Sequence, residues 1–122
     1  MAKVLVVEDD HFLGTAYKAK FTKEGYDFRL ATDGEEVAVV LKDFMPDVIL
    51  LDLVMPRKDG FTVLAELKQD PRLKDIPVIV ASNLGQQEDH ERAKQLGAVD
   101  YITKSELSLD AIVEKISKYS KV

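Results

Sequence analysis

Acidic, hydroxyl and ammonium side chains directly follow the short apolar runs of this 122-residue chain. The apolar runs are residues 4–7, 48–51, 78–81 and 101–103, and the residues that follow them are Glu8 with Asp9, Asp52, Ser82 and Lys104. If these runs are parallel strands, their carboxyl ends meet at one edge of a sheet, where open α/β folds place their sites. Carboxylates there would hold a divalent cation, while a lysine and a serine would contact phosphate oxygens. The arrangement therefore predicts Mg²⁺-dependent phosphoryl chemistry on an aspartate.

Two roles fit the acids that follow the first run. Glu8 and Asp9, beside a third carboxylate, cannot all ionise comfortably unless a cation neutralises them, and Mg²⁺ typically uses one or two carboxylates. A solvated turn that opens a helix would also contain acids, because negative charge favours helix N-termini. The sequence leaves both roles open for these two residues. Asp10 is assigned to the N-cap of the following helix.

Asp52 ends the most apolar run of the chain. Such a run predicts a central strand that is buried on both faces of the sheet. A buried carboxylate is costly unless a metal ion or hydrogen bonds compensate for it. A carboxylate held in this way can attack phosphorus and form an acyl phosphate. The alternative role for Asp52 is that of a structural acid that caps the next loop.

Helical patterns alternate with the apolar runs. A further strand is expected at 26–31, and helices are expected from Phe12 to a stop at Gly25, and at 35–44, 61–69, 86–96 and 107–118. Asp33 is the expected N-cap of the second helix. This (βα)₅ order with short connections predicts an α/β fold, a parallel sheet with helices on both faces. A single domain of residues 1–122 accounts for the length.

Composition excludes several classes of protein. The net charge of -5 gives no indication of a nucleic-acid-binding face. The absence of cysteine excludes disulfides and thiolate metal sites. No apolar run approaches the roughly 18 residues of a membrane helix, so we expect a cytoplasmic protein without membrane insertion. The isolated His11 and His90 are expected to be surface residues, while Arg57 and Lys58 either attract an anionic donor or belong to a solvated loop.

Four segments together match a known family. They are residues 6–9, 52–60, 81–82 and 97–104. On these segments the chain resembles the receiver domain of two-component response regulators, such as the chemotaxis receivers, over essentially its full length. The resemblance implies a flavodoxin-like (βα)₅ sandwich, whose five-stranded parallel sheet has the order 2-1-3-4-5.

The resemblance also implies a role for each site residue. Asp52 would accept a phosphoryl group from a sensor histidine kinase or phosphotransfer protein, and Lys104 would pair with the phosphoryl oxygens. Ser82 and Tyr101 would switch position on phosphorylation. The switch would alter a surface made by the last strand and its flanking helices, which would bind a downstream protein target. The expected Mg²⁺ ligands are Glu8, Asp9, Asp52 and the backbone carbonyl of Val54.

Four positions that depart from the family pattern affect the expected chemistry. Asn83 follows the switch hydroxyl, where the family usually has alanine. Ser105 follows Lys104, where the family usually has proline, often after a cis peptide bond. A cis bond before a non-proline residue costs roughly 2.5–4 kcal/mol, so either this bond is trans with a differently placed Lys104, or strain is stored there. Val54 and Leu84 are apolar where polar side chains often orient an attacking water, which predicts slow self-dephosphorylation.

The leading prediction is a phosphorylation-switched signalling protein that catalyses only its own phosphoryl transfer and dephosphorylation, and is therefore not an enzyme. A Mg²⁺-dependent aspartyl phosphotransferase would also use Asp52, but such enzymes commonly have a second acid at the position of Val54. A degenerate receiver would act as a constitutive protein-binding module, as Asn83 and Ser105 allow. A flavodoxin-type nucleotide or flavin binder would need a glycine-rich phosphate loop where the acids at 8–10 stand.

Overall fold

Five parallel strands form one sheet in the order β2-β1-β3-β4-β5. The strands are β1 (Lys3–Val7), β2 (Asp27–Ala31), β3 (Val48–Leu51), β4 (Val78–Ser82) and β5 (Asp100–Thr103). The computed structural model describes residues 2–83 and 87–120. β1, β3 and β4 lie inside the sheet and are almost entirely buried, whereas the edge strands β2 and β5 are only partly buried. The predicted flavodoxin-like fold and its strand order are confirmed.

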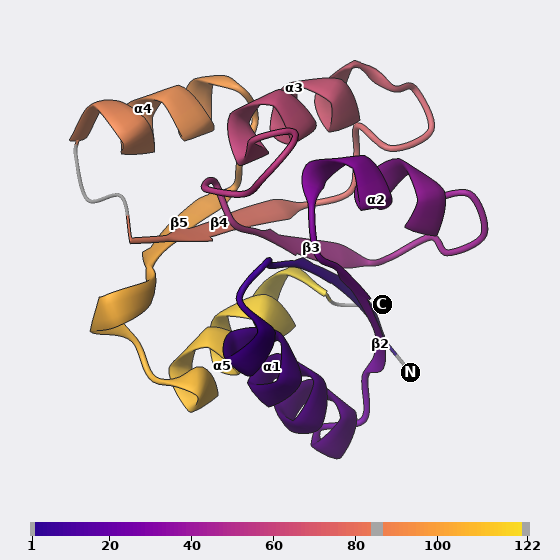
Figure 1. The fold of residues 1–122 in the computed structure, drawn as a ribbon, viewed down its shortest axis with the longest axis vertical. Coiled ribbons are helices and arrows are strands. Elements are labelled where there is room, and N and C mark those ends of the chain that lie inside the picture. The colour runs from indigo at the N-terminus through magenta and orange to yellow at the C-terminus, as the bar shows by residue number, and fades with distance from the viewer. Residues whose placement is uncertain (1, 84–86, 121–122) are drawn as a thin grey trace.

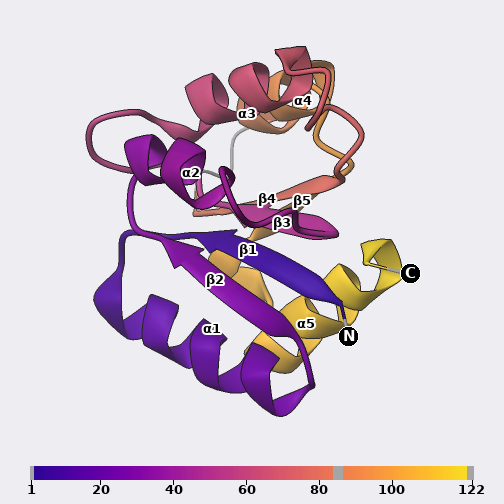
Figure 2. The same cartoon turned by 90° about the vertical axis from the view of Figure 1, so that its right-hand side faces the viewer.

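Helices cover both faces of the sheet (Figures 1 and 2). One face carries α1 (His11–Lys23) and α5 (Leu109–Tyr119), and the other carries α2 (Gly34–Val40), α3 (Gly60–Gln69) and α4 (Gln87–Gln95). Each face has its own apolar core, which includes Tyr17 and Phe21 on the first side and Leu64 on the second. The two cores hold the strands rigidly and so fix the positions of the residues that follow them. No helix in the described part of the chain is long and apolar enough to cross a membrane.

Side-chain caps fix where the first two helices begin. Asp10 accepts the backbone N–H three residues later at 2.9 Å, which confirms its predicted role as an N-cap. Asp33 accepts the N–H groups of Glu35 and Glu36 at 2.8 and 2.9 Å. α1 stops before Gly25, whose φ of 88° is a left-handed conformation that favours glycine. These caps satisfy backbone groups that would otherwise lack partners, so the turns after β1 and β2 have defined geometry.

α2 is shorter than predicted, ending at Val40 rather than at Phe44. Beyond the end of α2, backbone N–H groups donate to the carbonyl three residues earlier. The N–H of Lys42 donates to Val39 at 3.3 Å, and that of Asp43 donates to Val40 at 3.4 Å. This pattern of tight turns replaces the α-helical one. Phe44 remains buried, so its apolar character indicated the core correctly but not the helix boundary.

The last helix begins two residues later than predicted, at Leu109. Ser108 caps it by accepting the N–H of Ala111 at 3.2 Å. A short 3₁₀ helix, η1 (Lys104–Glu106), follows β5 and was not predicted. Gln86, the predicted start of α4, lies outside the described residues.

Asp100 links the edge strand β5 to α5. Its Oδ2 accepts hydrogen bonds from Lys115 Nζ at 2.9 Å and from the Tyr119 hydroxyl at 3.2 Å. Its Oδ1 accepts the N–H of Tyr101 at 2.8 Å. Burial alone would raise the pKa of the Asp100 carboxyl, but the hydrogen bond from Lys115 and the other donors outweigh burial and hold the pKa below its ordinary value. The charged form of Asp100 is therefore the one that stabilises this contact.

Replacing Asp100 with asparagine should lower the free energy of unfolding at neutral pH by about 1 kcal/mol, because the charge-assisted bond from Lys115 is weakened. A carboxyl whose pKa falls on folding stabilises the protein above its unfolded pKa of about 3.9. This contribution is lost as the pH falls through the lower, folded pKa. Urea unfolding of both proteins from neutral to acid pH measures the difference. The stability gap should narrow at acid pH, and a constant gap would contradict this role.

Candidate functional site

The strand register brings the predicted site residues to one edge of the sheet. Val7 of β1 pairs with Leu51 of β3, so the acids after these strands are neighbours. The N–H of Asp52 donates to the Val7 carbonyl at 3.0 Å. Ser82 of β4 pairs with Thr103 of β5, which puts the following lysine at the same edge. A cavity of about 430 Å³ opens there, lined by the predicted residues Glu8, Asp9, Asp52, Val54, Ser82 and Lys104 and also by Asp10 and Asn83.

Lys104 bridges two buried carboxylates in this cavity. Its Nζ donates to Asp52 Oδ2 at 3.0 Å and to Glu8 Oε1. Glu8 and Asp52 are only 2% and 6% exposed, so both need compensation for lost hydration. Backbone groups supply a part of it, because the N–H of Asp10 donates to Glu8 at 3.2 Å and that of Val54 to Asp52 at 3.3 Å. The buried carboxylate expected from the apolar run before Asp52 is therefore present and hydrogen-bonded.

The pKa values of this cluster follow from burial and from the ion pairs. Burial raises the pKa of the Glu8 carboxyl above its ordinary value, although the hydrogen bond from Lys104 opposes the shift. Burial alone would lower the pKa of the Lys104 ammonium, but the hydrogen bond to Glu8 and the charge of Asp52 outweigh burial and raise it. Lys104 is therefore positively charged at neutral pH.

Three carboxylates of the cluster fit a divalent metal ion. Glu8, Asp9 and Asp52 each offer one oxygen, and these oxygens lie within 4.8 Å of one another. Carboxylate oxygens are hard ligands that suit Mg²⁺ better than softer metals. Three negative charges against the single ammonium of Lys104 leave two charges, which a divalent ion would balance. Glu8, Asp9 and Asp52 are therefore close enough together for one divalent ion to contact all three.

Gly60 allows the start of α3 to pack against the residues after β3. Its N–H donates to the Leu53 carbonyl at 2.9 Å. A Cβ at this position would meet the carbonyl oxygen of Asp52 and would lie 2.6 Å from the Leu53 Cα. Both are backbone atoms, so a side chain here would displace the segment that carries Asp52. The backbone of Asp52 can therefore occupy its observed position only because residue 60 has no side chain.

Tyr101 connects the site to α4. Burial raises the pKa of the Tyr101 phenol above its ordinary value, and the nearby Ser82 side chain at the end of β4 opposes that shift. Its ring stacks on His90 of α4, with ring centroids 3.8 Å apart and planes inclined by 20°. The sequence predicted an isolated surface role for His90, but the residue is half-buried and packs on the predicted switch tyrosine. This contact depends on how α4 lies over β5, for which a single helical histidine gives no signal.

The peptide bond between Lys104 and Ser105 is trans, which decides between the two options left by the missing proline. Lys104 nevertheless reaches both Glu8 and Asp52. The N–H of Ser105 donates to Oδ1 of Asn83 at 3.1 Å. The departure at Ser105 therefore leaves the lysine in contact with the acids.

Both basic residues of the loop after Asp52 form ion pairs within the chain. Arg57, in the left-handed conformation with φ 67°, donates to Asp33 Oδ2 at 2.7 Å. Lys58 donates to Glu66 of α3 at 2.9 Å. These contacts tie the loop to the start of α2 and to α3, so the loop is held beside the cavity by its own charges.

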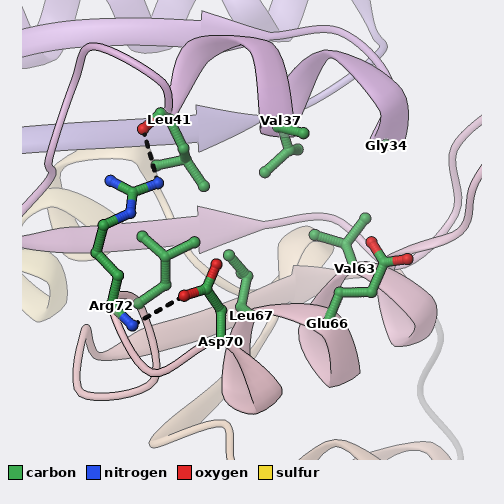
Figure 3. Close-up of a pocket in the computed structure, with 10 residues that line it drawn as sticks. Gly34, Val37, Leu41, Val63, Glu66, Leu67, Asp70 and Arg72 are labelled. Carbon is green, nitrogen blue, oxygen red and sulfur yellow. Dashed lines mark hydrogen bonds between the residues drawn. The ribbon is translucent and has the colours of Figure 1, made fainter.

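A separate apolar pocket lies between α2 and α3 (Figure 3). Val37 and Leu41 face Val63 and Leu67 across it, and the guanidinium of Arg72 donates to the Leu41 carbonyl at 3.0 Å. Its volume of about 220 Å³ is smaller than that of the acidic cavity, and the two share no lining residue. This pocket belongs to the packing of two helices and contains none of the predicted site residues.

Known proteins share this sequence pattern. The family model of the response regulator receiver domain matches residues 4–117. The DNA-binding dual master transcriptional regulator RpaA from Synechocystis sp. is 38% identical over 104 residues, which cover 85% of this chain and 43% of RpaA. The chain spans half the length or less of the curated relatives that it matches in this way.

Solved structures share the fold. The receiver domain of the Francisella response regulator 1452 has a TM-score of 0.89 at 32% identity, over 98% of this chain and 97% of that domain. The Mn²⁺-bound form of response regulator Rcp1 has a TM-score of 0.83 at 30% identity, over 98% of this chain and 94% of that chain.

Replacing Gly60 with alanine should destabilise the protein by about 1–3 kcal/mol, because the new Cβ overlaps backbone atoms that cannot move aside. Gly14→Ala in α1 is the matched control, since its Cβ would meet only the end of the Leu30 side chain at 3.2 Å. That control should be neutral or stabilising because alanine favours helix. Urea unfolding compares the two variants, and equal stabilities would show that the contact at Gly60 does not constrain β3.

Proposed function

This chain belongs to the response regulator receiver domain family, whose model matches residues 4–117, and we propose that it accepts a phosphoryl group on Asp52. Receiver domains are signalling proteins of two-component systems, and phosphorylation and Mg²⁺ binding are typical of the family. The donor would be a sensor histidine kinase or a phosphotransfer protein, with which receiver domains interact. We also propose that residues 1–122 form one receiver domain that works in the cytoplasm and inserts into no membrane.

The contact between Asp52 and Lys104, in a cavity with three further acids, is the observation that carries this proposal. Asp52 directly follows the central strand β3, so its backbone is rigidly placed. Lys104 lies close enough to pair with a phosphoryl group bonded to that carboxylate. The Mn²⁺-bound form of the similar protein Rcp1 is consistent with a divalent ion at such a site.

In the proposed transfer, a carboxylate oxygen of Asp52 attacks the phosphorus of a donor phosphohistidine. The new P–O bond forms as the donor's P–N bond breaks, and the imidazole leaves with the electron pair of that bond. Lys104 pairs with the phosphoryl oxygens after the carboxylate has lost its own charge. Mg²⁺, held by Glu8, Asp9, Asp52 and the Val54 carbonyl, would supply positive charge that reduces repulsion between the carboxylates and the phosphoryl oxygens.

Phosphorylation would change the contacts of Ser82 and Tyr101. A phosphoryl group on Asp52 adds negative charge and strong hydrogen-bond acceptors beside the Ser82 hydroxyl. If that hydroxyl turns toward the phosphoryl group, the surroundings of the nearby Tyr101 change, and with them the ring stack on His90. We propose that the resulting difference in the surface of α4, β5 and α5 is what a downstream protein target binds.

Incubation of the protein with acetyl phosphate and Mg²⁺ should add one phosphoryl group, measured by intact mass. Asp52→Asn should gain none, because the amide is not a nucleophile. Asp43→Asn, which changes an exposed acid outside the cavity, should react like the wild type. A wild type that gains no group would contradict the proposal and favour a constitutive binding module. Turnover of small phosphate esters would favour a phosphotransferase.

The acyl phosphate should be long-lived because the side chain at the cavity mouth is apolar. Val54 is 57% exposed there, where a polar group would orient an attacking water. Leu84, the second apolar position named for this effect, lies outside the described residues. Val54→Asn should shorten the lifetime by roughly tenfold, the effect of about one hydrogen bond, while Val54→Leu should not. Intact mass measured over time follows the loss of the phosphoryl group. Its loss from the wild type within seconds would contradict the prediction.

A further inference from the structure

The 3₁₀ helix η1 begins directly after β5 without a cap of its own. Thr103 stands at its N-cap position but makes no side-chain capping hydrogen bond. The first N–H groups of any helix lack partners within it. Here the N–H of Ser105 is satisfied by Oδ1 of Asn83 at 3.1 Å, from the end of a different strand. Asn83 therefore caps a helix to which it does not belong.

The register of the sheet explains why this contact forms. Ser82 and Thr103 are paired residues at the ends of β4 and β5. One residue further along, the amide of Asn83 is long enough to reach the backbone just beyond the opposite strand. The hydrogen bond thus extends the cross-strand connection past the end of the ladder.

The contact lies one residue from the ammonium that reaches the acids. Ser105 follows Lys104, whose Nζ bridges Glu8 and Asp52. Lysine has a flexible four-carbon stem, so the position of its charge depends on where its backbone is held. Asn83 itself lines the same cavity as Asp52.

The residues at these two positions are also chemically complementary. Alanine in place of Asn83 would have no acceptor, and proline in place of Ser105 would have no N–H to donate. The departures from the family pattern at Asn83 and Ser105 are therefore the acceptor and the donor of one hydrogen bond.

We propose that Asn83 is a positioning residue of the phosphoacceptor site. By accepting the N–H of Ser105, it holds the backbone from which Lys104 reaches Asp52, and so sets how tightly the site binds a phosphoryl group. This inference rests on the proposed function of Asp52. It assigns no metal ligand to Asn83, so the affinity for Mg²⁺ should depend on Asn83 less than the affinity for a phosphoryl mimic does.

Beryllofluoride mimics a phosphoryl group, so its binding in the presence of Mg²⁺ tests the proposal. Calorimetry measures the affinity. Asn83→Ala and Ser105→Pro should each weaken binding by roughly threefold to tenfold, the effect expected for one partly exposed hydrogen bond. The double variant should be no weaker than either single one, because both remove the same bond. Ser105→Ala keeps the N–H and should bind like the wild type. Mg²⁺ affinity, measured separately, should change less than beryllofluoride affinity in Asn83→Ala and Ser105→Pro, and should be unchanged in Ser105→Ala.

Three results would overturn the proposal. The first is an Asn83→Ala variant that binds beryllofluoride as tightly as the wild type, and the second is an equal loss of beryllofluoride affinity in Ser105→Ala and Ser105→Pro. The third is a parallel loss of Mg²⁺ affinity, which indicates general disruption of the site. Asn83 is exposed, so its alanine variant should fold. That variant keeps the test valid even if Ser105→Pro fails to fold.

Hydrogen exchange separates failure of this inference from failure of the proposed function. If the wild type binds no beryllofluoride, the proposed function is wrong. Exchange of the Ser105 amide hydrogen in the unliganded protein then tests whether Asn83 holds this amide, independently of ligand binding. It should be roughly tenfold faster in Asn83→Ala than in the wild type, and equal rates would overturn the positioning role.

Discussion

The ion pair between Lys104 and the buried carboxylates of Glu8 and Asp52 is the interaction on which the rest of the site depends. Two carboxylates that are 2% and 6% exposed would be strongly unfavourable without nearby positive charge. One ammonium compensates for only part of the charge once Asp9 is included. The folded chain therefore contains a preformed region of excess negative charge, with a lysine whose position is already set. Such an arrangement suits a divalent ion and an incoming phosphoryl group together.

The architecture and the cluster of acids could be predicted because they follow from local patterns. Central parallel strands are apolar on both faces, so the runs before Glu8, Asp52 and Ser82 identified them without any knowledge of the fold. Residues directly after such strands share one edge of the sheet, which predicted the cavity. The strand order came only from the family resemblance, since periodicity does not determine which strands are neighbours. Helix ends were less certain, as α2 shows, because a change from α to 3₁₀ bonding leaves the apolar pattern intact.

The contacts that the sequence did not predict join a side chain of one loop to a group in a distant part of the chain. Asn83 and Ser105 are 22 positions apart, and Asp33 and Arg57 are 24 apart. No periodic pattern encodes such pairs, because each depends on the direction in which a side chain leaves its loop. The stack of His90 on Tyr101 depends in the same way on the packing of α4. For Asn83 and Ser105 a signal was present, since both depart from the family pattern at adjacent strand ends, but only the geometry shows that they are partners.

A Mg²⁺ titration followed by backbone amide NMR tests the central claim most directly, because it reports on the charge cluster before any phosphoryl group is added. We predict saturable binding of one ion per chain, with the largest shifts in the residues that follow β1 and β3. Asp9→Ala, which changes an exposed acid of the cluster, should abolish or strongly weaken that binding without unfolding the protein. Absence of saturable shifts in the wild type, or unchanged binding in Asp9→Ala, would contradict the existence of a shared cation site.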